Sequence, residues 1–132
     1  MMGRKVARVL ESDPHYRGID LVVSIPLHPK REKSRGYNQS ELLARVIGKE
    51  LGLPVVNLLA RVKNNSSQTG LNEDERRKNV AGIFRFKTGI NGKKILLVDD
   101  VLTTGATMEE GAKVLKEAGA GEILGAVVAI AP

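Results

Sequence analysis

The sequence contains no cysteine, and aromatic residues make up only 3% of it. Without cysteine, no disulfide and no thiolate metal site can form. Proteins that bind single-stranded nucleic acid usually stack bases on several aromatic side chains, so the aromatic scarcity weakens that interpretation. No apolar run approaches the roughly 18 to 20 residues that a membrane-spanning helix needs, and the N-terminal residues lack the apolar stretch of a signal peptide. These absences are consistent with a cytoplasmic protein that has no membrane span.

The chain has 132 residues and a formal net charge of +6. That length is enough for one hydrophobic core and too short for two, which predicts a single domain spanning residues 1–132. The excess of positive charge favours anionic partners, namely nucleic acid, polyphosphate or a phosphorylated metabolite. Composition alone does not choose among these three.

Short apolar runs alternate with amphipathic segments along the chain, which predicts an α/β fold with a twisted, mostly parallel sheet flanked by helices. The expected strands are residues 19–25, 54–59, 83–86 (an edge strand), 95–98 and 123–130. The expected helices are residues 38–51, with an apolar stripe of Leu42, Leu43, Val46, Ile47 and Leu51, and residues 107–118. Capping boxes are expected at Asn38 with Glu41 and at Thr107 with Glu110. Residues 1–18 are expected to form a short N-terminal helical segment, and residues 63–79 a mobile loop.

In a parallel sheet of this kind, ligands bind beyond the carboxyl ends of the strands. Three segments leave predicted strands toward that edge: residues 26–37, the chain after Leu59, and residues 99–106. The chain therefore predicts that its binding residues gather on these three segments.

Asp99 and Asp100 directly follow the apolar strand at 95–98. Side chains alternate along an extended chain, so two adjacent carboxylates diverge and can hold two groups, such as the vicinal hydroxyls of a ribose or a metal bound to them. The small residues that come next lead into a helix N-terminus, where backbone N–H groups, hydroxyls and the helix dipole favour a phosphate dianion. The combination is suited to a ribose 5-phosphate; the simpler alternative is solvated acids followed by threonine caps.

Two other phosphate-related folds can be tested within the sequence. A response-regulator receiver domain also begins with an apolar strand and an acidic pair, but it needs a later aspartate, and none follows Asp100. A Walker-type loop requires GxxxxGK[ST], which does not occur. Both alternatives are therefore excluded.

Residues 95–107, ILLVDDVLTTGAT, resemble the phosphoribosyl pyrophosphate motif of type I phosphoribosyltransferases. Residues 23–44 and 61–84 resemble the ComF (ComFC/GntX-like) subgroup of that family, through SIPLHPKREKSRGYNQSELLA and through the spacing of Arg61, Gln68, Leu71, Arg76 and Asn79 with Phe84. The resemblance implies a type I phosphoribosyltransferase fold. It also implies a glycosyltransferase activity, a pentosyltransferase of nucleotide metabolism, that binds 5-phosphoribosyl 1-pyrophosphate with Mg²⁺. Such an enzyme transfers phosphoribose to a nitrogen nucleophile and releases pyrophosphate.

The resemblance assigns a role to each loop. Asp99 and Asp100 would bind the ribose and contact Mg²⁺ indirectly, through the ligand's hydroxyls or water. The 5-phosphate would lie on Thr103, Thr104, Gly105, Ala106 and Thr107. Pyrophosphate would contact His28, Lys30, Arg31 and Arg35, and the catalytic residues of the mobile loop would be Arg76, Arg77 and Gln68. The alternatives are a solvated basic loop at residues 26–38 and a solvated helical turn at EDERRK.

Three functions remain open at this point: phosphoribosyl transfer, a non-catalytic phosphoribosyl pyrophosphate-binding regulator or ComF-like accessory in DNA uptake and competence, and single-stranded DNA binding through the basic loop. The chain departs from the ComF pattern in having no cysteines for an N-terminal zinc ribbon. It also has few residues ahead of the first strand to form the hood that selects the acceptor. The acceptor is unidentified, and both a monomer and a homodimer are compatible with the sequence.

Overall fold

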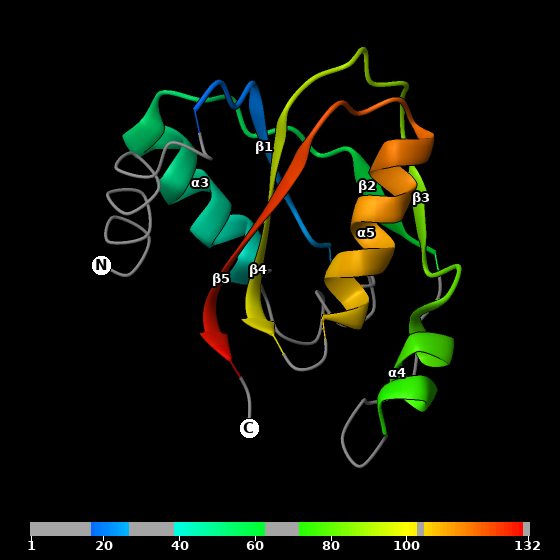
Figure 1. Ribbon diagram of the computed structural model, residues 1–132. Coiled ribbons are helices and arrows are strands. Elements are labelled where there is room, and N and C mark those ends of the chain that lie inside the picture. The colour runs from blue at the N-terminus through cyan, green and yellow to red at the C-terminus, as the bar shows by residue number, and fades with distance from the viewer. Residues whose placement is uncertain (1–16, 27–38, 63–71, 103–104, 131–132) are drawn as a thin grey trace.

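The computed structural model describes residues 17–26, 39–62, 72–102 and 105–130, in which strands and helices alternate (Figure 1). In chain order the elements are β1 (Leu21–Ser24), α3 (Gln39–Leu51), β2 (Leu59–Arg61), α4 (Glu73–Val80), β3 (Phe84–Phe86), β4 (Ile95–Leu102), α5 (Ala106–Glu117) and β5 (Ile123–Ile130). In this part of the chain, every helix is too short or too polar to cross a membrane. Most of the expected N-terminal helical segment, residues 1–16, lies outside the described residues.

The main sheet has the strand order β1-β4-β5, and both pairs are parallel, as the sequence predicts. At the β1 edge, the sheet is extended by a parallel bridge between Val22 and Val55. The Val22 N–H donates to the Pro54 carbonyl at 2.9 Å, and the Val56 N–H donates to the Val22 carbonyl at 2.9 Å. Residues 54–56 therefore flank β1 on the side away from β4.

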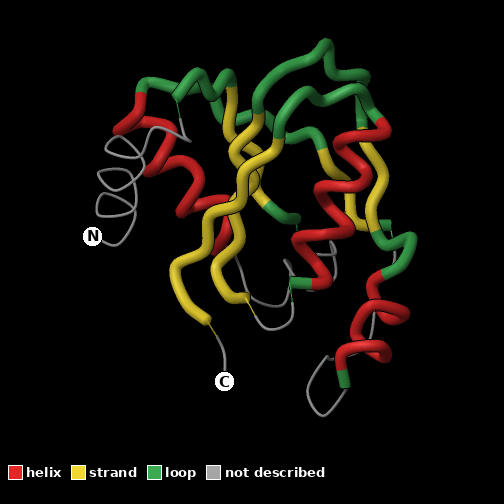
Figure 2. The backbone as a smooth tube through the Cα atoms, in the orientation of Figure 1, coloured by secondary structure: helices red, strands yellow, loops and turns green. Residues whose placement is uncertain are grey.

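A second, smaller sheet pairs β2 with β3 in antiparallel orientation (Figure 2). Here the structure corrects the expected single strand at residues 54–59. The chain accompanies β1 only as far as Val56, and β2 begins at Leu59, where Phe86 is its partner across the pair. The segment is divided because its two halves hydrogen-bond to different neighbours.

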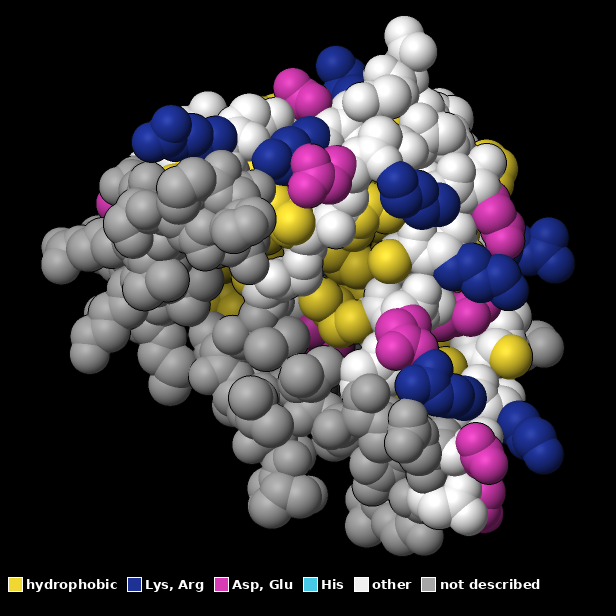
Figure 3. Space-filling view, in the orientation of Figure 1, with side chains coloured by type: hydrophobic (Ala, Val, Ile, Leu, Met, Phe, Trp, Pro, Cys, Tyr) yellow, Lys and Arg dark blue, Asp and Glu magenta, His cyan; other side chains and the backbone are white. Residues whose placement is uncertain are grey.

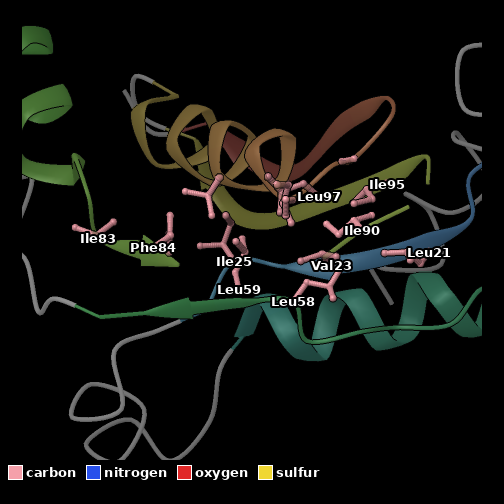
Figure 4. Packing of buried hydrophobic residues seen from close by; sticks show 14 of the residues in the cluster. Leu21, Val23, Ile25, Leu58, Leu59, Ile83, Phe84, Ile90, Ile95 and Leu97 are labelled. Atoms are coloured by element: carbon pink, nitrogen blue, oxygen red, sulfur yellow. The ribbon is translucent and has the colours of Figure 1, made fainter. Parts of the chain in front are cut away.

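The two faces of the main sheet are covered by different helices. Side chains alternate along a strand, so Val22, Leu96 and Val98 pack with the α3 residues Ala44 and Ile47. The intervening strand residues Val23, Ile95 and Leu97 face the other way and pack with Val114 and Leu115 of α5 (Figure 4). This alternation explains why β1 and β4 are apolar on both faces.

Helix α3 is rotated relative to the predicted apolar stripe. Its buried positions are Ser40, Ala44, Ile47 and Gly48, whereas Leu42 is 50% exposed. The reason is close packing: a Cβ at Gly48 would lie 2.7 Å from Cγ2 of Val55, so only a small residue fits where the helix meets the chain beside β1. Of the remaining stripe, Val46 is half-buried and Leu43, Ile47 and Leu51 pack in the core as expected.

Candidate functional site

The carboxyl ends of β4 and β5 and the amino ends of α3 and α5 lie at the same edge of the molecule, at the bottom of Figure 1. A parallel sheet with helical crossovers produces this arrangement, because each strand delivers the chain to the same edge before a helix returns it. The edge predicted from the sequence to bind ligands is therefore the one where these ends meet.

Strand β4 is longer than predicted, and both acidic residues belong to it. The expected strand ended at Val98, but β4 continues to Leu102, with Asp99 opposite Val127 and Leu102 opposite Ile130. The reason is that β5 runs on to Ile130 and keeps β4 extended. On the other side the β1–β4 register ends at the pair Ser24 and Val98. In β4, Asp99 thus follows directly after Val98, the last residue that pairs with β1.

The Asp99 carboxylate is held by helix α3. The Ser40 hydroxyl donates to Oδ1 of Asp99 at 3.0 Å, across 59 residues of sequence. Ser40 is in the first turn of α3 and is 4% exposed, and it is the one buried polar side chain among those that the structure describes. The sequence analysis did not single out Ser40. Of Asp100 only the backbone is described, so the expected divergence of the two carboxylates stays a prediction.

The start of α5 also differs from the expected one. The helix begins at Ala106 with Gly105 as N-cap, and Gly105 has a φ of +83°, a left-handed conformation that favours glycine. The expected capping box at Thr107 and Glu110 is wrong, because no side chain caps this helix and Thr107 already lies inside its first turn. Glu110 instead accepts a hydrogen bond from the Gly82 N–H at 3.1 Å. Thr103 and Thr104 lie outside the described residues.

The second half of the segment expected as a mobile loop forms helix α4. Asn72 caps it, accepting from the Glu75 N–H at 2.8 Å, while the Glu75 carboxylate accepts from the Asn72 N–H at 3.2 Å. This reciprocal cap supplies what the sequence of α4 lacks in apolar periodicity. The residues EDERRK are therefore helical, whereas the catalytic roles expected for Arg76 and Arg77 stay predictions. Gln68 lies outside the described residues.

The Arg77 guanidinium forms an ion pair with Glu109, in the first turn of α5. The contact is bidentate, with a second guanidinium nitrogen 3.4 Å from the other carboxylate oxygen. Arg77 therefore lies beside the α5 N-terminus in this conformation, held by an acid that the sequence analysis did not identify. The side chain of Arg76 is not described. His28, Lys30, Arg31 and Arg35 all fall in residues 27–38, outside the described residues.

A pocket lies at the carboxyl end of β1, next to residues 54–56. It is lined by Ser24, Pro26, Glu41, Arg45, Val55, Val56 and Asn57. Its basic side chain is engaged within its own helix, because Arg45 pairs with Glu41 at 2.9 Å. Sequence reasoning did not identify this pocket, and its residues are separate from the acidic pair on β4.

Among the described residues, charge on the visible face does not gather into one patch. In Figure 3 the Lys and Arg side chains alternate with Asp and Glu over the surface, around a central area of apolar side chains. Among the described residues, no three His, Cys, Asp or Glu side chains are placed to hold a metal ion together.

Comparison with protein families and known proteins agrees with the fold. A family model described as phosphoribosyl transferase domain matches residues 34–132. Competence protein F of Haemophilus influenzae is 36% identical over 108 residues, which cover 79% of this chain and 47% of that protein. Competence protein ComFC of Bacillus subtilis is 34% identical over 107 residues, covering 81% of this chain and 41% of that protein. The chain thus spans about half the length of the curated relatives that it matches.

Among solved structures, a purine phosphoribosyltransferase from Pyrococcus horikoshii superimposes with a TM-score of 0.61 and 20% identity. The match covers 98% of this chain and 74% of that one. At this identity the likeness bears on the fold, and it confirms the α/β architecture predicted from the sequence.

Proposed function

The chain belongs to the phosphoribosyltransferase family, in its ComF-like subgroup, and from this we propose that it binds 5-phosphoribosyl 1-pyrophosphate with Mg²⁺ and transfers phosphoribose to a nitrogen nucleophile. The observation that carries the proposal is the position of Asp99. Its carboxylate lies just beyond the end of β1 and is held by a buried hydroxyl, at the sheet edge where α5 begins. A fixed acid at the same edge as the N-terminus of α5 suits a molecule with hydroxyls at one end and a phosphate at the other.

Asp99 and Asp100 would bind the ribose ring. An ionised carboxylate can accept about four hydrogen bonds. In Asp99, one oxygen accepts a hydrogen bond from Ser40. A carboxylate oxygen suits a ribose hydroxyl, which is a donor. Acceptors of this kind distinguish a sugar with a free vicinal diol from one that lacks it.

The 5-phosphate would bind at the start of α5. A helix N-terminus carries about half a positive elementary charge and directs backbone N–H groups outward. Gly105 lets the chain turn sharply into the helix, and the half-buried Thr107 brings a hydroxyl to the same turn. Thr103 and Thr104 would complete this phosphate site, as the family resemblance implies.

Mg²⁺ would be held mainly by the bound molecule. Mg²⁺ commonly keeps several waters and binds through one or two carboxylates together with substrate phosphates. The described residues fit that role, because they include Asp99 but no group of three potential metal ligands. The cation would supply charge neutralisation for the diphosphate.

Catalysis would rest on orientation and charge. The bond between ribose C1 and the pyrophosphate oxygen breaks, the electron pair leaves with pyrophosphate, and the acceptor nitrogen bonds to C1 and loses its proton. Cations near the departing group stabilise its developing charge. We assign that work to His28, Lys30, Arg31 and Arg35 together with Arg76 and Arg77, and positioning to Gln68.

The alternative is a protein that binds phosphoribosyl pyrophosphate without turnover, as a regulator or as an accessory in DNA uptake. The two relatives, both named as competence proteins, support it. Release of pyrophosphate in the presence of candidate nitrogen bases distinguishes the two. Single-stranded DNA that competes with phosphoribosyl pyrophosphate would favour the accessory role.

The direct test is calorimetric titration of phosphoribosyl pyrophosphate into the protein with and without Mg²⁺. We expect Mg²⁺-dependent binding that Asp99→Asn/Asp100→Asn abolishes. Glu117→Gln is the matched control, because it removes an exposed acid at the opposite end of α5. Absence of binding by the unaltered protein would overturn the proposal, as would equal binding by the double variant.

A further inference from the structure

Ser40 is a buried serine that contacts a carboxylate far away in the sequence. It is 4% exposed, in the first turn of a helix, and serine hydroxyls in such positions usually bond to nearby backbone of the same helix. The Ser40 hydroxyl donates to Asp99 on another element, at 3.0 Å. A buried hydroxyl aimed at a carboxylate on the ligand edge points to a role in setting that carboxylate's geometry.

The geometry of the strand ends explains why α3 can reach Asp99. The Ile25 N–H donates to the Val98 carbonyl at 2.9 Å, and after that β1 no longer accompanies β4. The first turn of α3 lies close to the next residue of β4, as the Ser40 contact shows. Behind this turn, Ala44 and Ile47 are fully buried against Val98 and its neighbours, so the helix is anchored by packing.

We infer that Ser40 is a positioning residue: by holding Oδ1 of Asp99, it fixes the orientation of the carboxylate that binds the ribose hydroxyls. The inference rests on the proposed function and assigns to it a residue outside the acidic pair. A carboxylate that is fixed before binding avoids the entropy cost of being ordered on binding. Because Ser40 is buried, water does not readily take the place of its hydroxyl when the side chain is shortened.

The test compares three probes on the same variants, each with Mg²⁺: phosphoribosyl pyrophosphate, ribose 5-phosphate and inorganic pyrophosphate. Ser40→Ala should weaken the two ribose-containing probes about tenfold, or ~1.4 kcal/mol, and change inorganic pyrophosphate by less than about twofold. Ser40→Thr keeps the hydroxyl and should restore most of the affinity. Thr88→Ala is the control, because it removes an exposed hydroxyl from the segment that leads into the amino end of β4; it should leave all three affinities unchanged.

A double-variant cycle shows whether Ser40 acts through Asp99. The residual affinity of Asp99→Asn for phosphoribosyl pyrophosphate should not fall further when Ser40→Ala is added. Thermal melting of each variant verifies that it is folded. If Ser40→Ala is not, Ser40→Cys takes its place, because a thiol is a weak hydrogen-bond donor of similar size.

The outcomes separate this inference from the proposed function. If the unaltered protein binds none of the three probes, both fail. If it binds them and Ser40→Ala binds equally well, only the positioning role fails. Equal weakening of all three probes, or a further tenfold loss in the Asp99→Asn background, would show that Ser40 supports the helix instead of the carboxylate.

Discussion

Arg77 and Glu109 join helix α4 to the first turn of helix α5 through a bidentate ion pair. The pair neutralises an acid that lies within one turn of the proposed phosphate site. Both side chains are substantially exposed, 44% for Arg77 and 57% for Glu109, so the contact contributes only about 0 to 1 kcal/mol to stability. Its effect should therefore be seen in ligand binding more than in folding.

Arg77→Ala should weaken ribose 5-phosphate binding by about two- to fivefold at low salt. The reason is that the Glu109 carboxylate, no longer paired, repels a phosphate dianion at the same helix N-terminus. The difference should shrink at high ionic strength, where exposed charges are screened. Calorimetry at two salt concentrations measures both effects.

The double variant Arg77→Ala/Glu109→Gln is the control for this prediction. If Arg77 acts by neutralising Glu109, the double variant recovers the original affinity. A loss that persists in the double variant would mean that Arg77 contacts ribose 5-phosphate itself.

Asn72→Ala should loosen helix α4 locally. The helix has eight residues and little apolar surface, so its reciprocal cap and its contact with α5 supply much of its stability. Loss of a capping side chain costs about 1 kcal/mol. Hydrogen exchange should show faster exchange at the amides of residues 73–80 and an unchanged rate in β4. Uniform acceleration over both elements would contradict a local role.

The strands of the main sheet could be predicted because their signal is local. β4 contains the apolar run ILLV and β5 the run ILGAVVAI, and the bounds of β5 agree with the prediction. The end of β4 could not be predicted in this way. Its extension through Asp99 depends on pairing with a strand more than twenty residues later. No local sequence pattern predicts such a pairing.

Helix starts show how the same local signal can succeed or fail. An Asn-x-x-Glu pattern caps α4, where the sequence analysis expected a loop because apolar periodicity was missing. A Thr-x-x-Glu pattern at Thr107 predicted a cap that does not form, since Gly105 turns the chain earlier. Glu110 is then free of the capping role and holds the Gly82 N–H instead.

The acidic pair and the α5 turn were identified from the sequence because their residue types follow a strand and precede a helix. The contact of Ser40 with Asp99 was not, because it spans 59 residues and depends on where α3 begins relative to the end of β1. The ion pair of Arg77 with Glu109 likewise depends on how two helices pack. Contacts of this kind appear only once the chain is folded.

Two substitutions in α3 test the rotation of the helix. Ile47 is fully buried, so Ile47→Ala should destabilise the protein by about 2 to 5 kcal/mol through lost burial and the cavity it leaves. Leu42 is 50% exposed, and Leu42→Ala should cost less than about 1 kcal/mol. Urea unfolding measures both. Similar losses for the two variants would support the apolar stripe expected from the sequence over the face seen in the structure.

Gly105→Ala should impair both folding and binding, whereas Gly92→Ala should impair folding alone. Both glycines have positive φ, +83° at Gly105 and +65° at Gly92, so alanine at either should cost about 1 to 2 kcal/mol of strain. Nothing lies within 4 Å of a Cβ added at Gly92, which makes it a control for the backbone term. Gly105 shapes the turn into α5, so relief of its strain by a backbone shift would move the N–H groups proposed to bind phosphate. Urea unfolding and ribose 5-phosphate titration of the two variants separate these effects. Equal affinity in both variants would remove Gly105 from the phosphate site while leaving its structural role intact.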